Sequence, residues 1–107
     1  MTRVVVEAGN CGFTATVEVT KLSARKVGVA VASECETLIE MGGQLEELDW
    51  PDALKPPGDS PVYNTAFKCI RHAACPVPTA ILMAIEVEIG AAVPKDVSIR
   101  FENTRLT

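Results

Sequence analysis

The chain has 107 residues, of which 48% are hydrophobic and only 5% aromatic, and its 14 acidic residues outnumber its 10 basic ones. A chain of this length is expected to form one domain, residues 1–107, and to bury about 65% of its unfolded surface without disulfides. Binding to nucleic-acid phosphates needs a clustered positive field, which an acidic chain lacks. We therefore expect no nucleic-acid partner.

The sequence contains no stretch that resembles an export signal or a membrane span. Its first residues, "MTRVVVE", lack the long apolar core of a signal peptide. The longest apolar stretch, around residues 77–85, is followed by Glu86 and Glu88 and is too short to cross a bilayer. We expect a cytoplasmic protein without a membrane partner. In that compartment cysteines are more often reduced, metal-bound or catalytic than paired in structural disulfides.

The first third of the chain alternates apolar and polar side chains, which is typical of half-buried strands. The clearest run is "FTATVEVT", residues 13–20, with β-rich segments at 3–8 and 27–32 on either side of it. The turn residues of "GNCG" and "KLSARK" connect these three segments. The pattern predicts a three-stranded antiparallel meander.

The first predicted helix begins at Ser33-Glu34-Cys35-Glu36, which matches a capping box. Gly42 and Gly43 lie in the interior of this helix, where each costs about 1 kcal/mol of helix stability relative to alanine. If the helix is interrupted, we expect the break at these two glycines. The prolines, glycine and aspartates of "DWPDALKPPGDSP" predict a loop after this helix.

Two more helices are predicted from their proline starts. Ser60 followed by Pro61 gives an N-cap and a first-turn proline, and this helix is expected to run to about Ala73. The next is expected to begin at Pro78 and to end before Gly90, although residues 81–89 also fit a strand.

The last predicted element is a strand in "DVSIRFE", residues 96–102, where apolar and polar side chains alternate again. This strand is expected to close the sheet. The predicted fold is a single α+β domain with the order β-β-β-α-α-α-β, in which helices cover one face of a mainly antiparallel sheet.

The predicted topology brings the cysteines together. Cys11 lies in the turn after the first strand and Cys35 follows the end of the third, and in a meander these two points share one end of the sheet. Cys75 joins them if the last strand runs parallel to the first. Cys69 and His72 lie three residues apart on the second predicted helix, one turn from Cys75.

Such a cluster suits a metal. Thiolates are favoured at helix N-termini and beside cations, and they bind zinc or form iron–sulfur centres. The hypothesis is a zinc or iron–sulfur site with a role in binding or electron transfer. Its expected ligands are four cysteines, with a histidine as a reserve ligand or as a hydrogen-bond donor to a ligand: Cys11, Cys35, Cys69, Cys75 and His72. The spacing Cys-x-x-His-x-x-Cys differs from zinc ribbons and from haem attachment motifs.

Two other functions stay open. Cys75 attacking and Cys69 resolving would make a thiol–disulfide redox protein. Alternatively, the cysteines are incidental buried residues of an interaction domain, whose partner is an unidentified protein or a second copy, with Trp50 and Leu54 as an exposed anchor. Whether the protein is an enzyme is left open, because its single histidine has no evident orienting carboxylate.

The chain resembles a family of short uncharacterised four-cysteine proteins from anaerobic microbes. The resemblance covers nearly the whole chain and is carried by "NCGF", "SECE", "HAACPVPTAI", "AIE" and "VPKDVSI". It implies no established activity. The anaerobic setting that it implies would be compatible with iron–sulfur chemistry.

Overall fold

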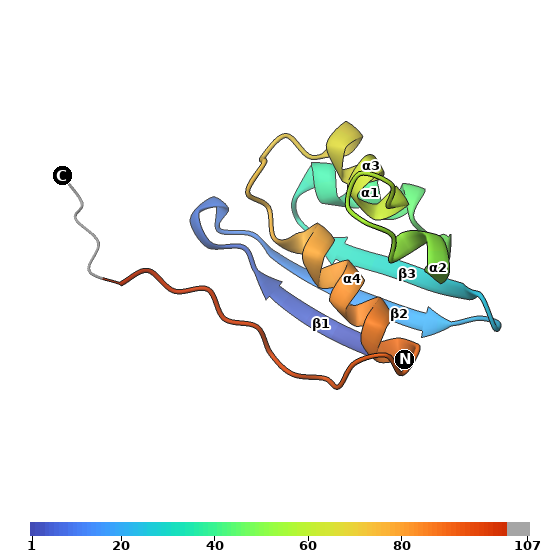
Figure 1. The fold of residues 1–107 in the computed structure, drawn as a ribbon. Coiled ribbons are helices and arrows are strands. Elements are labelled where there is room, and N and C mark those ends of the chain that lie inside the picture. Colours follow the sequence, from blue (N-terminus) through green and yellow to red (C-terminus); the bar gives the residue numbers. More distant parts are fainter. Residues whose placement is uncertain (103–107) are drawn as a thin grey trace.

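An antiparallel sheet forms one layer of the molecule and helices cover one of its faces (Figure 1). The computed structural model describes residues 1–102. The strands, in their spatial order, are β1 (Thr2–Glu7), β2 (Thr14–Lys21), β3 (Lys26–Ser33) and β4 (Glu47–Asp49). The helices are α1 (Glu36–Gln44), α2 (Trp50–Ala53), α3 (Pro61–Cys69) and α4 (Val77–Glu88), and a 3-10 turn, η1 (Gly9–Cys11), links β1 to β2. The predicted α+β class and the predicted meander are confirmed.

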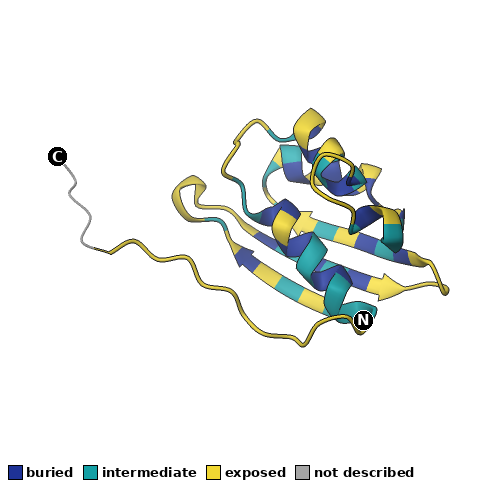
Figure 2. Cartoon of the chain, viewed as in Figure 1, coloured by how far each residue is buried: buried dark blue, intermediate teal, exposed yellow. Residues whose placement is uncertain are grey.

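The core lies between the sheet and the helices (Figure 2). On β2 the alternation seen in the sequence places Ala15, Val17 and Val19 on the buried face, with the intervening residues less buried. Helix α4 packs on β1 and β2, whereas α1 packs on β3. Ile81 and Ile85 of α4 are completely buried, because residues four apart share one face of a helix.

The segment that fits either a helix or a strand is a helix through Glu88. Proline occupies the first turn of α4, where a missing N–H costs little, and Gly90 follows its end with φ of 83°. The Glu88 carboxylate then joins three segments. It accepts hydrogen bonds from the Thr2 hydroxyl and the Lys21 amide, each 2.8 Å long, and lies 3.3 Å from the terminal amine of Met1.

Helix α1 continues through both glycines instead of breaking at them. A Cβ atom added to Gly42 would lie 2.9 Å from Cβ of Val31 on β3, whereas one added to Gly43 would meet nothing within 4 Å. Gly42 therefore lets α1 lie close against the sheet, and this packing compensates for the low helix propensity of glycine.

The region predicted as a loop contains the short elements β4 and α2. Strand β4 pairs antiparallel with residues 26–28 of β3, and the Asp49 side chain caps α2 by accepting from the Asp52 amide. Elements of three and four residues are too short to show a periodicity in the sequence.

Helix α3 begins as predicted, with Ser60 as its N-cap and Pro61 in its first turn, but it ends at Cys69 instead of Ala73. Ile70 has an extended backbone, with φ of −87° and ψ of 129°, and packs against the core. The prediction that Cys69 and His72 share one face of this helix is therefore wrong, because His72 lies beyond the helix end.

The strand predicted at residues 96–102 is not formed. Residues 90–102 are exposed, and the chain after α4 runs past β1 and away from the body (Figures 1 and 2). The fourth strand of the sheet is β4 instead. Alternation describes which side chains suit a strand, whereas a strand forms only where its backbone is aligned with that of a partner strand. In the part of the chain that the structure describes, no helix has the length and apolar character needed to span a bilayer.

Candidate functional site

Cys11 lies on the exposed turn between β1 and β2. Gly9 and Gly12 flank it with φ of 80° and 75°, a left-handed conformation that glycine adopts without strain. The Gly12 amide donates to the Gly9 carbonyl over 2.9 Å, which closes the turn. The turn therefore presents the Cys11 side chain to solvent at the end of the sheet.

Cys35 is the N-cap residue of α1 and is half buried. The predicted capping serine acts differently from the prediction: the Ser33 hydroxyl accepts from the Cys35 amide over 3.1 Å and donates to the Thr14 carbonyl over 3.0 Å. Ser33 thus fixes the backbone of Cys35 against the start of β2, and leaves the cysteine at the first turn of the helix.

The surroundings of Cys35 favour its thiolate. Its Sγ lies 3.2 Å from the Thr37 hydroxyl, and this hydrogen bond is the main reason that the pKa of Cys35 falls below its ordinary value. The backbone amides of Leu38 and Thr37 lower the pKa of Cys35 further. Their contacts with the Cys35 sulfur do not have the geometry of an N-cap hydrogen bond. A helix N-terminus stabilises a thiolate in this way.

Cys75 lies just before α4 and is half buried. Its pKa is raised, first because burial disfavours the charged form, and the Val77 amide opposes this effect. The negative charges of the Cys11 and Cys35 thiolates raise the pKa of Cys75 further. The raised pKa therefore keeps Cys75 protonated at a higher pH than an ordinary cysteine.

Three of the four cysteines lie on segments at one end of the sheet. The turn after β1, the exit of β3 and the start of α4 meet at that end (Figure 1). We call Cys11, Cys35 and Cys75 the thiol cluster. That their sulfur atoms share a ligand stays a prediction.

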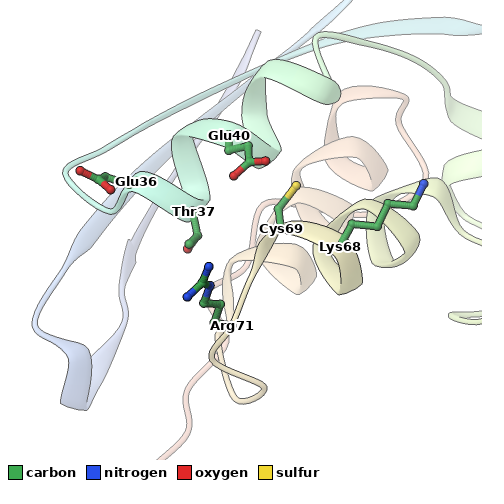
Figure 3. Close-up of a pocket in the computed structure, with 6 residues that line it drawn as sticks. All are labelled: Glu36, Thr37, Glu40, Lys68, Cys69 and Arg71. Carbon is green, nitrogen blue, oxygen red and sulfur yellow. The ribbon is translucent and has the colours of Figure 1, made fainter.

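Cys69 lies elsewhere. It is buried at the end of α3, and its Sγ accepts a hydrogen bond of 3.4 Å from the side-chain amide of Gln44, the last residue of α1. Gln44 follows Cys35 by nine residues, or about 13 Å of helix rise. Figure 3 shows the Cys69 sulfur on the side of α1 that carries Glu40. Cys69 therefore belongs to the contact between α1 and α3, away from the thiol cluster.

An open depression of about 480 Å³ adjoins Cys69 and is bordered by charged side chains of both signs (Figure 3). Its lining residues are Glu36, Thr37, Glu40, Lys68, Cys69 and Arg71. Arg71 points toward Thr37, which also contacts the Cys35 sulfur. This depression was missed in the sequence, because its two walls come from segments about thirty residues apart and neither carries a motif.

His72 occupies the exposed turn that leads to Cys75, and the Cys75 amide donates to its carbonyl over 3.0 Å. Within residues 1–102, no three histidine, cysteine, aspartate or glutamate side chains are arranged closely enough to hold a metal ion as they stand. All four cysteines are free thiols.

The proposed exposed anchor is not exposed. Trp50 and Leu54 are partly buried and pack against the core, and the Trp50 indole donates to the Ala24 carbonyl over 2.9 Å. These residues attach α2 to the body of the same chain.

The comparisons with known proteins identify a family without an assigned activity. No curated protein and no solved structure matches the chain significantly. The model of a family of unknown function, DUF6951, matches residues 2–101, and the chain therefore belongs to this family.

Proposed function

We propose that the protein binds zinc or an iron–sulfur centre through Cys11, Cys35 and Cys75, in a binding or electron-transfer role. The observation that carries this proposal is the placement of three cysteines, 24 and 40 residues apart in the chain, on segments at the same end of the sheet (Figure 1). These segments are the η1 turn, the start of α1 and the start of α4.

The electrostatics of the cluster favour a cation. The pKa of Cys35 is already lowered, whereas the pKa of Cys75 is raised, first by burial and then by repulsion from the charges of Cys11 and Cys35. A bound metal ion is usually the largest local charge in such a site and deprotonates the thiols that coordinate it. It would relieve the repulsion that the protein alone leaves in place.

His72 is the proposed fourth ligand, which would complete a Cys3His set of the kind that holds structural zinc. It lies in the short turn before Cys75 and is exposed. The sulfurs are not yet at bonding distance, so binding would draw the exposed Cys11 turn and the 70–76 segment inward. Metal binding and local ordering are commonly coupled in this way.

The proposal leaves Cys69 outside the ligand set, because it is buried and already accepts a hydrogen bond from Gln44. A cytoplasmic location, where thiols stay reduced, would suit either metal centre. The anaerobic origin implied by the resemblance would favour the iron–sulfur alternative.

The test is metal analysis and absorption spectroscopy on untagged protein prepared without oxygen. We expect stoichiometric zinc, or iron with sulfide, in the unmodified chain. Serine at position 11, 35 or 75 should lower the metal content to a small fraction. Cys69→Ser is the matched control and should retain the metal, while His72→Ala should weaken zinc retention against a chelator.

Two results would contradict the proposal. A folded protein that neither contains metal nor takes up zinc or a reconstituted cluster removes the site altogether. Equal loss in Cys69→Ser and in the three cluster variants would instead restore Cys69 to the ligand set and exclude the narrower site proposed here.

The second candidate is a thiol–disulfide exchange protein, and the lowered pKa of Cys35 favours it. The Cys35 thiolate would attack a disulfide and release one thiolate, and Cys75 would then displace the second, leaving a Cys35–Cys75 disulfide and a reduced dithiol. A low-molecular-weight thiol would regenerate the pair.

These roles differ from those predicted for Cys75 and Cys69, because burial raises the pKa of Cys75. Selective alkylation of Cys35 at neutral pH would support exchange, and four equally slow thiols would argue against it.

A further inference from the structure

The segment of residues 96–102 has the side-chain pattern of a strand, but it forms no strand with any other part of residues 1–102. Val97, Ile99 and Phe101 alternate with polar residues, and their side chains are 67%, 84% and 88% exposed. An extended segment with three large apolar side chains on one face loses the hydrophobic stabilisation that pairing would give. The segment therefore needs a surface to cover it.

The molecule has a matching edge. Strand β1 lies at the edge of the sheet and, among the residues that the structure describes, pairs with β2 alone, so its other side presents backbone N–H and C=O groups without a strand partner there. Val4 and Val6 lie on the inner face of β1, where α4 packs on the sheet. Met83 and Val87, four residues apart on one face of α4, are only half buried.

We propose that the C-terminal segment of one copy pairs antiparallel with β1 of a second copy, and that the exchange is reciprocal. The register places Phe101 opposite Val4, Ile99 opposite Val6 and Glu102 opposite Arg3. The apolar side chains then extend the inner face of the sheet, and two opposite charges face each other on the outer one. Reciprocal exchange closes the dimer with two-fold symmetry.

The course of the chain favours a second copy over the segment's own β1. Glu88, at the end of α4, is held against Thr2 at the start of β1, and the chain then runs in the same direction as β1 (Figure 1). Pairing from that course would be parallel, which is slightly less stable per residue, and would not oppose Glu102 to Arg3. A second copy can approach in the antiparallel sense.

The charges at the outer face have no strong competing partner within the segment. Glu102 lies 3.8 Å from Arg100, and both side chains are about three-quarters exposed, so this pair contributes little. Arg3 lies opposite Glu18 across β1 and β2, and its side chain is exposed. Arg3 therefore remains able to meet a carboxylate on the free side of β1.

The first experiment is sedimentation equilibrium of the full chain. We expect a dimer that dissociates on dilution. Replacing Ile99 and Phe101 by aspartate should give a monomer with unchanged circular dichroism, because neither side chain contributes to the core of the single chain. Val93→Asp is the matched control: this side chain is 75% exposed and lies outside the paired stretch, so the dimer should persist.

The second experiment tests the register by exchanging charges. Arg3→Glu and Glu102→Arg should each weaken the dimer by roughly tenfold, since every dimer contains two of these pairs. The double variant should recover most of the affinity, although Arg3→Glu also places two carboxylates opposite each other across β1 and β2. A lack of recovery overturns the register.

Other outcomes overturn the proposal as a whole. A chain that is monomeric at all accessible concentrations would overturn the dimer. Slow hydrogen exchange of the backbone amides of residues 96–102 in such a monomer would show that the segment pairs with its own β1 instead. A dimer that survives the Ile99 and Phe101 changes would overturn the proposal as well. These readouts involve neither the cysteines nor metal, so they are independent of the proposed function.

Discussion

The two ends of the sheet differ in how their polar groups are used. At the end where β1 begins, the Glu88 carboxylate accepts two hydrogen bonds of 2.8 Å and ion-pairs with the chain terminus, so its interactions all serve the fold. At the other end, Cys11 is exposed, and the thiolate of Cys75 is disfavoured first by burial and then by the charges of neighbouring thiols. The polar groups at the first end are paired with one another within the fold. The thiols at the other end are reactive groups that the fold does not need for its stability.

The largest expected effect is at the first end of the sheet. Glu88→Ala should lower the free energy of unfolding by about 2–3 kcal/mol, because it leaves donors on β1 and β2 without their charged acceptor. Denaturant unfolding measures the change. Glu86→Ala, two residues earlier on α4, is the control and should stay within about 0.5 kcal/mol of the unmodified protein. Equal effects at both positions would show that helix propensity, and not the Glu88 contacts, is responsible.

The next effect concerns the packing of α1, the helix that begins after Cys35, on strand β3. Gly42→Ala should destabilise the protein by about 1–2 kcal/mol, because its methyl group would press on Val31 and separate α1 from β3. Gly43→Ala meets no atom within 4 Å and should instead stabilise α1 by about 0.5–1 kcal/mol. Thermal unfolding of the pair distinguishes them. A stabilised Gly42→Ala variant would mean that the close approach of α1 is not required.

The pH dependence of the free energy of unfolding tests the role of the Glu88 charge at the first end of the sheet. Hydrogen bonds from the Lys21 amide and then the Thr2 hydroxyl hold the pKa of Glu88 below its ordinary value of 4.5. A carboxyl with a lowered folded-state pKa stabilises the protein above its unfolded-state pKa, and this contribution disappears as the pH falls through the folded-state value. The stability difference between the unmodified protein and Glu88→Gln should therefore be constant near neutrality and shrink below about pH 4.5. A difference that is independent of pH would exclude the Glu88 charge as its cause.

The smallest expected change in stability, and the most local one, is at the thiol end. Thr37→Val removes the hydroxyl that contacts the Cys35 sulfur while keeping the side-chain shape, so the pKa of Cys35 should rise and its alkylation at pH 7 should slow. Mass spectrometry of the labelled site follows the rate. Thr79→Val, whose hydroxyl bonds to Tyr63, is the control and should leave the rate unchanged. An unaffected rate in Thr37→Val would remove the hydroxyl from the account of Cys35 reactivity.

Much of the fold was accessible from local patterns. The alternation around Val17 predicted the central strand, and the Ser60-Pro61 pair predicted the start of α3. The candidate site was accessible in part, because meander topology alone placed Cys11 near Cys35. The position of Cys69 was not, since it depends on where α3 ends and on the contact with Gln44.

The sequence by itself determined the alternation of the strand around Val17, the N-cap of α3 at Ser60 and the glycine positions of the turn around Cys11, because these depend on neighbouring residues. Only the tertiary structure decided that Cys69 lies against Gln44, that Gly42 serves packing against Val31, and that residues 96–102 form no strand with the other described residues. These outcomes depend on distances between segments far apart in the chain. Such distances are set by how the helices pack on the sheet, and no local pattern specifies them.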